Sequence, residues 1–528
     1  MSRARCVLLL AALGGAGTMV VELAAVRLLA PWFGTSLVVW TNVIGVILLA
    51  LSLGYLAGAR WSRARDPLAG LATVLLAAGA ATALLPFFTG RVADLFLPDT
   101  LALDEALPLV TWGSLSTALL LFLVPAALLG AVAPLSVEAV GRLAGRGAGD
   151  AGGRVLAAST LGSLAGVFGT THVLVPRLGL AGTFFAAAGV LAAAGALGLF
   201  VARRRAPLLA LALIPPALAL GGGEVVRHPQ PGWEVLARRE SLYQSLRVSE
   251  DRRGPEPMRQ LQVNEAFDSF QSVWQPAPGL LPEGYYYNYF TLPLFWSAPR
   301  GPFRVLVLGL GAGTTWRVLE GVAPEGVDIA LEGVELDPAV VALARDYMGL
   351  PEDDAHHRAL SGVDARVALR GERAPLDLVV LDCYANQVEI PFHLATVEFL
   401  REVRSALAPG GWLALNAGGF GFDDPLVAAL SATVAAAFEG EALVVRVPAS
   451  RNFVIYGRRD APLPVEEGRL AAAGGEAEAL LAPLAVPGGF RRIGRDGGRV
   501  LTDDDAPLEE LQLASIRAAH RLLREGAP

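Results

Sequence analysis

Three acidic side chains lie at positions where a carboxylate could bind a ligand or accept a proton. Glu335, Asp364 and Asp382 each end or follow an apolar segment of the chain. Short apolar runs of this kind have the length of buried parallel strands. Acids at the carboxyl ends of such strands point into the crevice where α/β sheets bind ligands. We therefore expect the three carboxylates to lie along one edge of a sheet.

A glycine-rich turn precedes these acids. The apolar run Val305 to Leu308 breaks into Gly309, Gly311 and Gly313, and a helical pattern follows. Glu335 ends a second apolar run about 20 residues further on, where an acid can accept both ribose hydroxyls. Glycine lets the backbone approach a ligand closely. The GxGxG spacing favours an S-adenosylmethionine type of site over a dinucleotide site. A tight turn without a ligand is the alternative.

Two further positions extend the predicted nucleoside site. Asp364 and Ala365, in SGVDARVAL, come where an acid can accept the adenine amino group. Asp382, in LDLVVLDCYANQ, ends the next apolar run. For Asp382 the alternative is an acid that makes only backbone contacts.

The composition divides the chain and excludes several functions. Of 528 residues 53% are hydrophobic, and these concentrate before residue 224. The net charge of −7 gives no argument for nucleic acid, and the absence of lysine excludes a Schiff base. Cys6 and Cys383 do not form a disulfide framework, because Cys6 begins a membrane segment. The histidines and acids show no zinc-ligand spacing, so we predict no metal.

Seven apolar segments each have close to the ~20 residues of a membrane-spanning helix. They lie near residues 6–30, 36–58, 69–89, 112–135, 154–176, 178–201 and 206–222. Gly54 and Gly58, and Gly162 and Gly166, are four apart, which favours close helix packing. Plain glycine abundance is the alternative.

The arginine clusters orient these segments in the lipid bilayer. They predict a cytoplasmic N-terminus and a cytoplasmic Arg203 to Arg205 cluster. The last segment contains Pro215 and Pro216, which a helix tolerates poorly. It is either re-entrant or a true seventh span. We expect the first, with the soluble half in the cytoplasm; a seventh span would place that half outside.

Two stretches carry a family resemblance. Residues 21–58 resemble the opening of bacterial membrane-fused spermidine synthase-like proteins. Residues 233–510 resemble the spermidine synthase family of aminopropyltransferases through ESLYQSLRV, LQVNEAFDSFQS, LGLGAG, VELD, VDARV, LDCYANQ and LTDDDAPLE. We therefore expect a multi-span α-helical membrane domain at 1–224 and a small β-rich domain at 225–290. A Rossmann-like methyltransferase fold should follow at 291–528, with a helix at about 391–408 that ends at Gly410.

The resemblance implies roles for individual residues. The donor, decarboxylated or ordinary S-adenosylmethionine, would be bound by Gln244, Gly309, Gly311, Gly313, Glu335, Asp364 and Ala365. Asp382 would be the base that takes a proton from the attacking amine. The amine itself would contact Tyr243, Gln271 and Tyr384, the two tyrosines through their ring faces. For Tyr384, simple packing is an equal alternative.

Departures from the family pattern concern the acceptor. The family usually has acids where this chain has Ala312 and Ala385, and a polar segment where it has Tyr285 to Tyr287. We expect these three tyrosines to pack in a domain seam, and we expect weak or altered diamine selectivity.

Three functions compete on the sequence alone. The first is a membrane-anchored aminopropyltransferase acting on a small-molecule amine. The second is another S-adenosylmethionine-dependent transferase, such as a methyltransferase. The third is a transporter or sensor whose nucleoside domain only binds ligand. A homodimer is left open.

Overall fold

A computed structural model describes residues 2–34, 37–63, 66–96, 109–145, 147–203, 232–263, 271–384, 390–463 and 488–524, with Pro215, Leu218, Ala219 and Leu480. The chain divides into two compact units. The first holds the helices up to Val201 and the turn at Arg238–Leu246. The second holds the larger sheet, most of the smaller sheet and the remaining helices.

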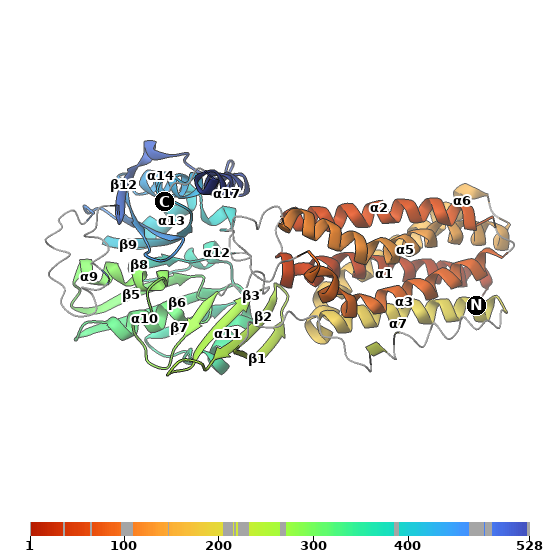
Figure 1. The fold of residues 1–528 in the computed structure, drawn as a ribbon, viewed down its shortest axis with the longest axis horizontal. Coiled ribbons are helices and arrows are strands. Elements are labelled where there is room, and N and C mark those ends of the chain that lie inside the picture. Colours follow the sequence, from red (N-terminus) through yellow and green to blue (C-terminus); the bar gives the residue numbers. More distant parts are fainter. Residues whose placement is uncertain are drawn as a thin grey trace. The chain divides into compact units, whose positions relative to one another are not determined.

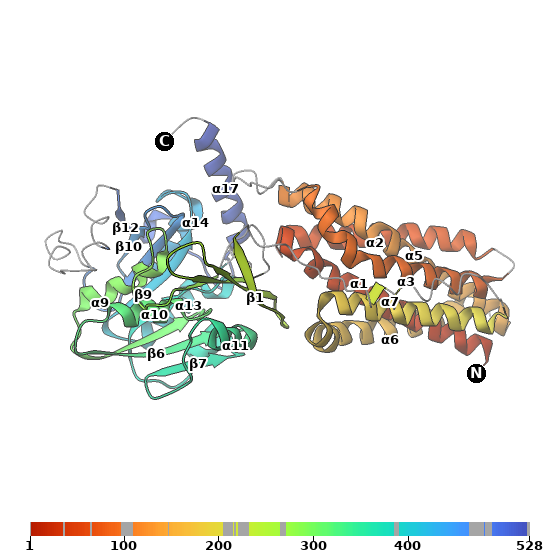
Figure 2. The ribbon, with the colours of Figure 1, turned by 60° about the horizontal axis from the view of Figure 1, so that its bottom comes forward.

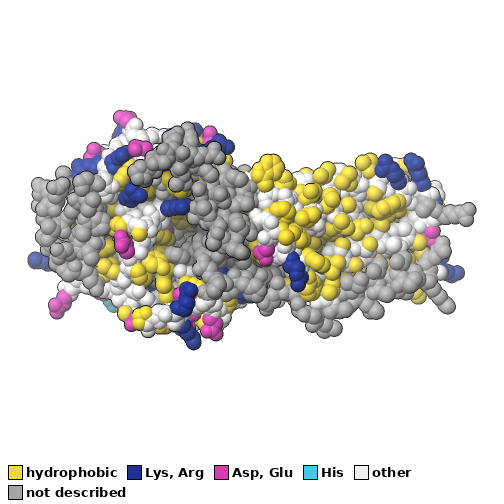
Figure 3. All heavy atoms as spheres, in the orientation of Figure 1, with side chains coloured by type: hydrophobic (Ala, Val, Ile, Leu, Met, Phe, Trp, Pro, Cys, Tyr) yellow, Lys and Arg dark blue, Asp and Glu magenta, His cyan; other side chains and the backbone are white. Residues whose placement is uncertain are grey.

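Long apolar helices make up the first unit (Figure 1). They are α1 (Arg3–Phe33), α2 (Leu37–Trp61), α3 (Pro67–Asp94), α5 (Ser114–Ala144), α6 (Ala148–Gly169) and α7 (Val175–Val201), with π-helical turns η1 (Leu109–Gly113) and η2 (Thr170–Leu174). Among the described residues, five helical stretches are long and apolar enough to cross a membrane, with Ala148–Val201 counted as one. Hydrophobic side chains gather over the visible face of this unit (Figure 3).

Small residues bring these helices into close contact. A Cβ at Gly54 in α2 would lie 2.1 Å from the carbonyl oxygen of Ala127 in α5. A Cβ at Gly162 in α6 would lie 1.8 Å from the carbonyl oxygen of Ala12 in α1. A side chain at either glycine would separate its helix pair. The predicted close packing is therefore confirmed for α2 with α5 and for α1 with α6.

The predicted segments at 6–30, 36–58, 69–89, 112–135, 154–176 and 178–201 all fall on helices of this unit. The two last segments run on through η2, and Gly179, with φ +67°, interrupts the regular helix there. Most of the seventh segment, 206–222, lies outside the described residues.

The second unit begins with a small four-stranded sheet, visible in Figure 2. Its order is β1-β2-β3-β4. The strands are β1 (Trp233–Glu240), β2 (Ser245–Asp251), β3 (Met258–Val263) and β4 (Ser272–Trp274). The short helices η5 (Tyr286–Thr291) and α9 (Leu292–Ser297) then lead into a larger sheet.

The larger sheet has the order β12-β10-β11-β9-β8-β5-β6-β7 over the residues described. Its strands are β5 (Gly301–Leu308), β6 (Val327–Glu335), β7 (His357–Ser361), β8 (Leu376–Leu381), β9 (Leu407–Gly418), β10 (Glu441–Arg446), β11 (Asn452–Arg458) and β12 (Phe490–Gly494). Strands β5 to β9 pair in parallel, and β11 pairs antiparallel with β9 and β10.

This strand order creates a ligand-binding crevice. From the central β5 the chain runs outward to β7 and then returns to β8 on the other side of β5. The carboxyl ends of β5 and β8 therefore flank a topological switch point, where α/β sheets bind ligands. The Rossmann-like methyltransferase fold predicted from the sequence is confirmed.

Helices cover the larger sheet on both faces (Figures 1 and 2). They are α10 (Thr314–Val322), α11 (Pro338–Tyr347), α12 (Ala365–Leu369), α13 (Val397–Ala406) and α14 (Pro425–Ala437). The last helix, α17 (Leu508–Arg524), packs on α14. Side chains of α12, α13 and α14 share one apolar core with the strands. The helix predicted at 391–408 is too long. Strand β9 already begins at Leu407, which pairs with Leu376, and contains Gly410.

Candidate functional site

The glycine turn after β5 packs directly against the end of β8. Gly309 has φ +86°, and a Cβ there would lie 2.3 Å from the carbonyl oxygen of Asp382. Gly311 has φ +54°, and a Cβ there would lie 2.5 Å from Oγ of Ser272. Gly313, with φ +83°, precedes α10. Both the backbone conformation and the lack of space require glycine at 309 and 311.

Glu335 ends β6 and reaches back to this turn. One carboxylate oxygen accepts a hydrogen bond from the N–H of Gly311, and the other accepts one from the N–H of Asp337, each at 3.0 Å. Burial raises the pKa of Glu335 to about 7, although these hydrogen bonds oppose the increase. Each oxygen has a second lone pair, so the carboxylate can also accept hydrogen bonds from hydroxyl groups of a ligand.

Asp382 follows β8 and is held by two side-chain donors. Nδ2 of Asn416 donates to Oδ1 of Asp382 at 2.9 Å, and the Tyr286 hydroxyl donates to Oδ2 at 3.2 Å. Its backbone N–H donates to the Leu308 carbonyl at 2.8 Å. Burial raises the pKa of Asp382 to about 7, and the two side-chain hydrogen bonds limit the increase. A carboxylate with a pKa near 7 is suited to take up a proton at neutral pH.

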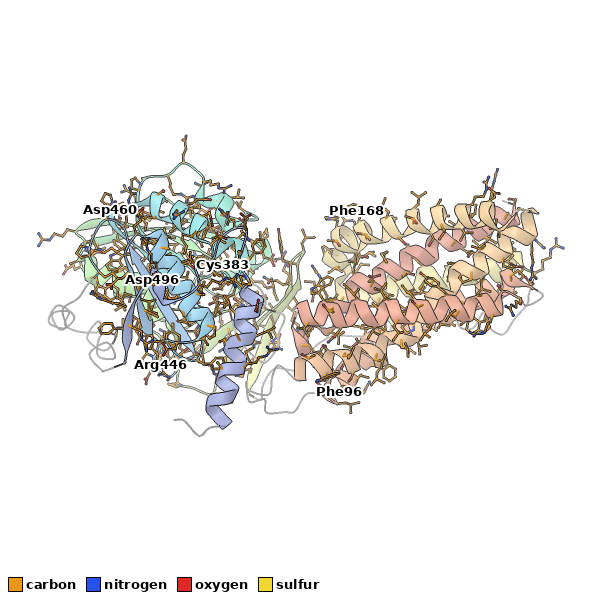
Figure 4. All side chains as sticks on the ribbon, turned by 90° about the horizontal axis from the view of Figure 1, so that it is seen from above. Phe96, Phe168, Cys383, Arg446, Asp460 and Asp496 are labelled. Atoms are coloured by element: carbon orange, nitrogen blue, oxygen red, sulfur yellow. The ribbon has the colours of Figure 1, made fainter. Side chains whose placement is uncertain are left out.

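Tyrosines surround the Asp382 carboxylate. Packing alone, as predicted for Tyr285 to Tyr287, does not describe Tyr286, because its hydroxyl also donates to Asp382. The hydroxyl of Tyr287 donates to the carbonyl of Gln271 at 2.6 Å, and that of Tyr384 to the carbonyl of Asn416 at 2.9 Å. Figure 4 labels Cys383, the residue that follows Asp382, in the second unit.

Asp364 lies at the start of α12, where it acts as a helix cap. One carboxylate oxygen accepts hydrogen bonds from the N–H groups of Arg366 and Val367, and the other is 2.9 Å from Nε2 of His393. Burial raises the pKa of Asp364, but the hydrogen bonds from His393 and Val367 outweigh burial and lower it overall. Ala365 is the first residue of α12 and is buried. Adenine recognition by both residues stays a prediction.

The remaining predicted residues differ in position. Gln271 precedes β4 close to the glycine turn, and a Cβ at Gly311 would lie 3.8 Å from its carbonyl oxygen. Tyr243 and Gln244 lie in the turn between β1 and β2, which belongs to the first unit. Their contacts with donor and amine stay predictions. Within the described ranges, no group of three or more His, Cys, Asp or Glu side chains could hold a metal ion.

Sequence reasoning missed Asn416 as a site residue. It lies near the carboxyl end of β9, which pairs in parallel with β8, and only 2% of it is exposed. Its position in WLALNAG, a polar residue near the end of an apolar run, is the signal that could have identified it.

The fold and the site define a class of protein. It is a Rossmann-like domain, in which the strand-end carboxylate of Glu335 accepts a hydrogen bond from the glycine turn, in one chain with long apolar helices. Comparison with curated proteins makes this class specific. Polyamine aminopropyltransferase 2 of Streptomyces coelicolor is 30% identical over 431 residues, covering 76% of this chain and 71% of that protein. The chain belongs to the polyamine aminopropyltransferase family, as the motifs predicted.

Other relatives match over shorter stretches. The polyamine aminopropyltransferase of Mycobacterium tuberculosis is 29% identical over 316 residues, covering 55% of this chain and 56% of that protein. The probable polyamine aminopropyl transferase of Bifidobacterium longum is 27% identical over 227 residues, covering 40% of this chain and 49% of that protein. The chain thus spans about half the length of these two relatives. No family model matches the chain.

Solved structures were compared as well. The probable spermidine synthase of Corynebacterium glutamicum is 20% identical with a TM-score of 0.41, covering 51% of this chain and 97% of that one. The spermidine synthase of Thermotoga maritima is 15% identical with a TM-score of 0.36, and the match covers 47% of this chain and 82% of that one.

Proposed function

We propose that this protein transfers an aminopropyl group from decarboxylated S-adenosylmethionine to an amine. Family membership supports the reaction class, because the curated relatives are named for it. The observation that carries the proposal is the position of Asp382. Its carboxylate lies at the switch point, and its backbone packs against Gly309 of the predicted nucleoside turn.

The reaction requires what this arrangement offers. The amine nitrogen attacks the propyl carbon next to the sulfonium, a nitrogen–carbon bond forms and the carbon–sulfur bond breaks. The sulfonium keeps the bonding electron pair and becomes a neutral thioether. The attacking nitrogen loses a proton, and Asp382 takes it. Asp382 also attracts the amine cation before reaction, so one carboxylate both positions the acceptor and removes its proton.

The donor is proposed to bind across the carboxyl ends of β5 and β6. Glu335 would accept the ribose hydroxyls with the lone pairs that Gly311 and Asp337 leave unused. Asp364 would accept from the adenine amino group only by sharing an oxygen with its present donors. The glycine turn gives the ligand close access to the backbone.

The acceptor is proposed to be a small amine held mainly by Asp382. Ala312, buried in the glycine turn, offers no side-chain acid, and Ala385 lies outside the described residues. We therefore expect weak or altered selectivity for diamines such as putrescine. The ratio of kcat/KM for diamines to that for monoamines measures this selectivity. Tight and specific use of putrescine would contradict the expectation.

The apolar helices are proposed to anchor the enzyme in a lipid bilayer. In the part of the chain that the structure describes, five helical stretches have sufficient length and hydropathy. Because the donor is a cytoplasmic metabolite, we place the catalytic domain on the cytoplasmic side.

Mass spectrometry of reaction products tests the proposed function. Purified full-length protein would be incubated with decarboxylated or ordinary S-adenosylmethionine and a panel of amines. We expect aminopropylated amine and the thioether nucleoside from the decarboxylated donor only. Methylated products from the ordinary donor would instead assign a methyltransferase, and donor binding without turnover a sensor or transporter.

A further inference from the structure

A run of side-chain hydrogen bonds reaches Asp382 from the turn between β10 and β11. Nδ2 of Asn416 donates to Oδ1 of Asp382, and Nδ2 of Asn452 donates to Oδ1 of Asn416, both at 2.9 Å. The Ser450 hydroxyl donates to Oδ1 of Asn452 at 2.9 Å. The antiparallel register of β9 and β11, with Asn452 opposite Gly418, brings the two asparagines together.

The direction of each bond in this run follows from Asp382, because an ionised carboxylate can only accept hydrogen bonds. Nδ2 of Asn416 therefore faces Oδ1 of Asp382, and Oδ1 of Asn416 is left to accept from Nδ2 of Asn452. Oδ1 of Asn452 then accepts from the Ser450 hydroxyl, whose oxygen also accepts from the backbone N–H of Asn452 at 3.3 Å. Because Asn416 is buried, reversing its amide would leave polar atoms without partners.

The direction of the run matters for the ionisation of Asp382. An N–H donor facing a carboxyl group favours its charged form. If the Asn416 amide were reversed, its oxygen would face Oδ1 of Asp382, and only a protonated Asp382 could donate to it. The run thus acts against burial, which disfavours the carboxylate.

We propose that Asn416, Asn452 and Ser450 are positioning residues that keep Asp382 ionised and oriented to accept the amine proton. The proton-transfer part rests on the proposed function. The effect on the ionisation of Asp382 does not, because it follows from hydrogen bonds present without substrate.

Other titratable groups face Asp382 from the elements around it. Tyr286 and Tyr287 come from η5, and Cys383 and Tyr384 from the loop after β8. Burial raises the pKa of all four, so they stay neutral at the pH values where Asp382 titrates. Glu335, whose pKa is also raised to about 7, acts on Cys383 and is unchanged in every variant below.

Substitutions at Asn452 test the proposal without touching Asp382. Asn452→Ala removes the amide that donates to Asn416. Asn452→Asp replaces that amide by a carboxylate of the same shape, which can only accept. The carboxylate therefore attracts Nδ2 of Asn416 away from Asp382. The Arg451→Gln variant is the matched control, because Arg451 lies in the same turn, exposed, with its guanidinium over Phe420. The pH profile of kcat/KM is measured for the full-length protein.

We expect the acid limb of the profile to move to higher pH in both Asn452 variants, and further in Asn452→Asp. For a limb displaced by one pH unit, kcat/KM falls about fivefold at pH 7 and returns to the wild-type value above about pH 9. The control should keep the wild-type limb. An equal loss at every pH in the Asn452 variants would overturn the proposal, because it would show a merely structural role.

A second readout separates this inference from the proposed function. Ionisation of Asp382 lowers stability, so the wild-type unfolding midpoint should fall as pH rises through about 7. In the Asn452 variants this fall should move to higher pH. If the protein has no transferase activity but the pH dependence of its stability shifts in this way, the proposed function is wrong and the role of the three positioning residues stands. If the protein is active but neither the acid limb of kcat/KM nor the pH dependence of the unfolding midpoint moves, only the role of the positioning residues is wrong. If the Asn452 variants do not fold, Ser450→Ala should move the same limb and Ser450→Thr, which keeps the hydroxyl, should not.

Discussion

Two carboxylates at strand ends have pKa values near 7 because burial disfavours their charged forms. Glu335 differs from Asp382 in its partners, which are backbone N–H groups of the glycine turn and of Asp337. We expect Glu335→Gln to weaken binding of S-adenosyl ligands by about 1–3 kcal/mol, the scale of a hydrogen bond to a charged group. Isothermal calorimetry measures this change. Glu332→Gln, on the same strand and paired with Arg373, is the control; unchanged affinity in Glu335→Gln would remove Glu335 from the site.

The raised pKa of Asp382 also predicts a pH-dependent stability. Its pKa in the folded protein, about 7, exceeds the ordinary value of 3.8, so the unfolded chain binds fewer protons between these values. Stability is therefore highest below the ordinary pKa and is lost as pH rises through about 7. Asp382→Asn removes this loss. At pH 8 the free energy of unfolding of the variant should exceed that of the wild type by about 4 kcal/mol, at 1.36 kcal/mol per pKa unit. The difference should be smaller at pH 5, and a pH-independent difference would contradict the assigned pKa.

At the scale of elements, the contact between the glycine turn and β8 couples the two parts of the site. Gly309→Ala would place a Cβ 2.3 Å from the Asp382 carbonyl oxygen at a positive φ, so the turn and the end of β8 must separate. We expect donor affinity and turnover both to fall by about five- to 150-fold, from about 1–3 kcal/mol of backbone strain and displacement. Gly494→Ala, where a Cβ meets nothing within 4 Å, should leave both unchanged. Equal donor affinity in the two variants would show that the turn is not part of the binding site.

The sequence predicted the elements that depend on local pattern. The apolar helices follow from length and hydropathy, and β5, its glycine turn and Glu335 follow from one continuous motif. Gly410 was misread as a helix end, because glycine at φ +82° also serves inside β9. The run from Ser450 to Asp382 was not predictable in this way. It depends on the antiparallel register of β9 and β11, which brings together residues 36 positions apart.

At the scale of the whole molecule, the number of membrane crossings would determine on which side of the bilayer the proposed reaction takes place. An even number of crossings from a cytoplasmic N-terminus would keep the catalytic domain with its donor. Most of the doubtful segment, 206–222, lies outside the described residues, and the three-part division at 224 and 290 likewise stays a prediction. We expect a reporter that matures only outside the membrane to stay inactive when fused after Pro528. Strong reporter activity would place the domain outside, away from an intracellular donor.

The most direct test of the account measures aminopropyl transfer by wild type and Asp382→Asn, together with donor affinity. Purified full-length proteins would receive decarboxylated S-adenosylmethionine and the best amine of the panel. We predict that wild type forms aminopropylated amine, and that turnover in Asp382→Asn falls on the order of 10²–10⁴-fold, because the base is lost. Donor affinity should stay within about twofold, since the carboxylate acts on the amine. Wild-type turnover in Asp382→Asn, or no aminopropylated product from either protein, would contradict the account.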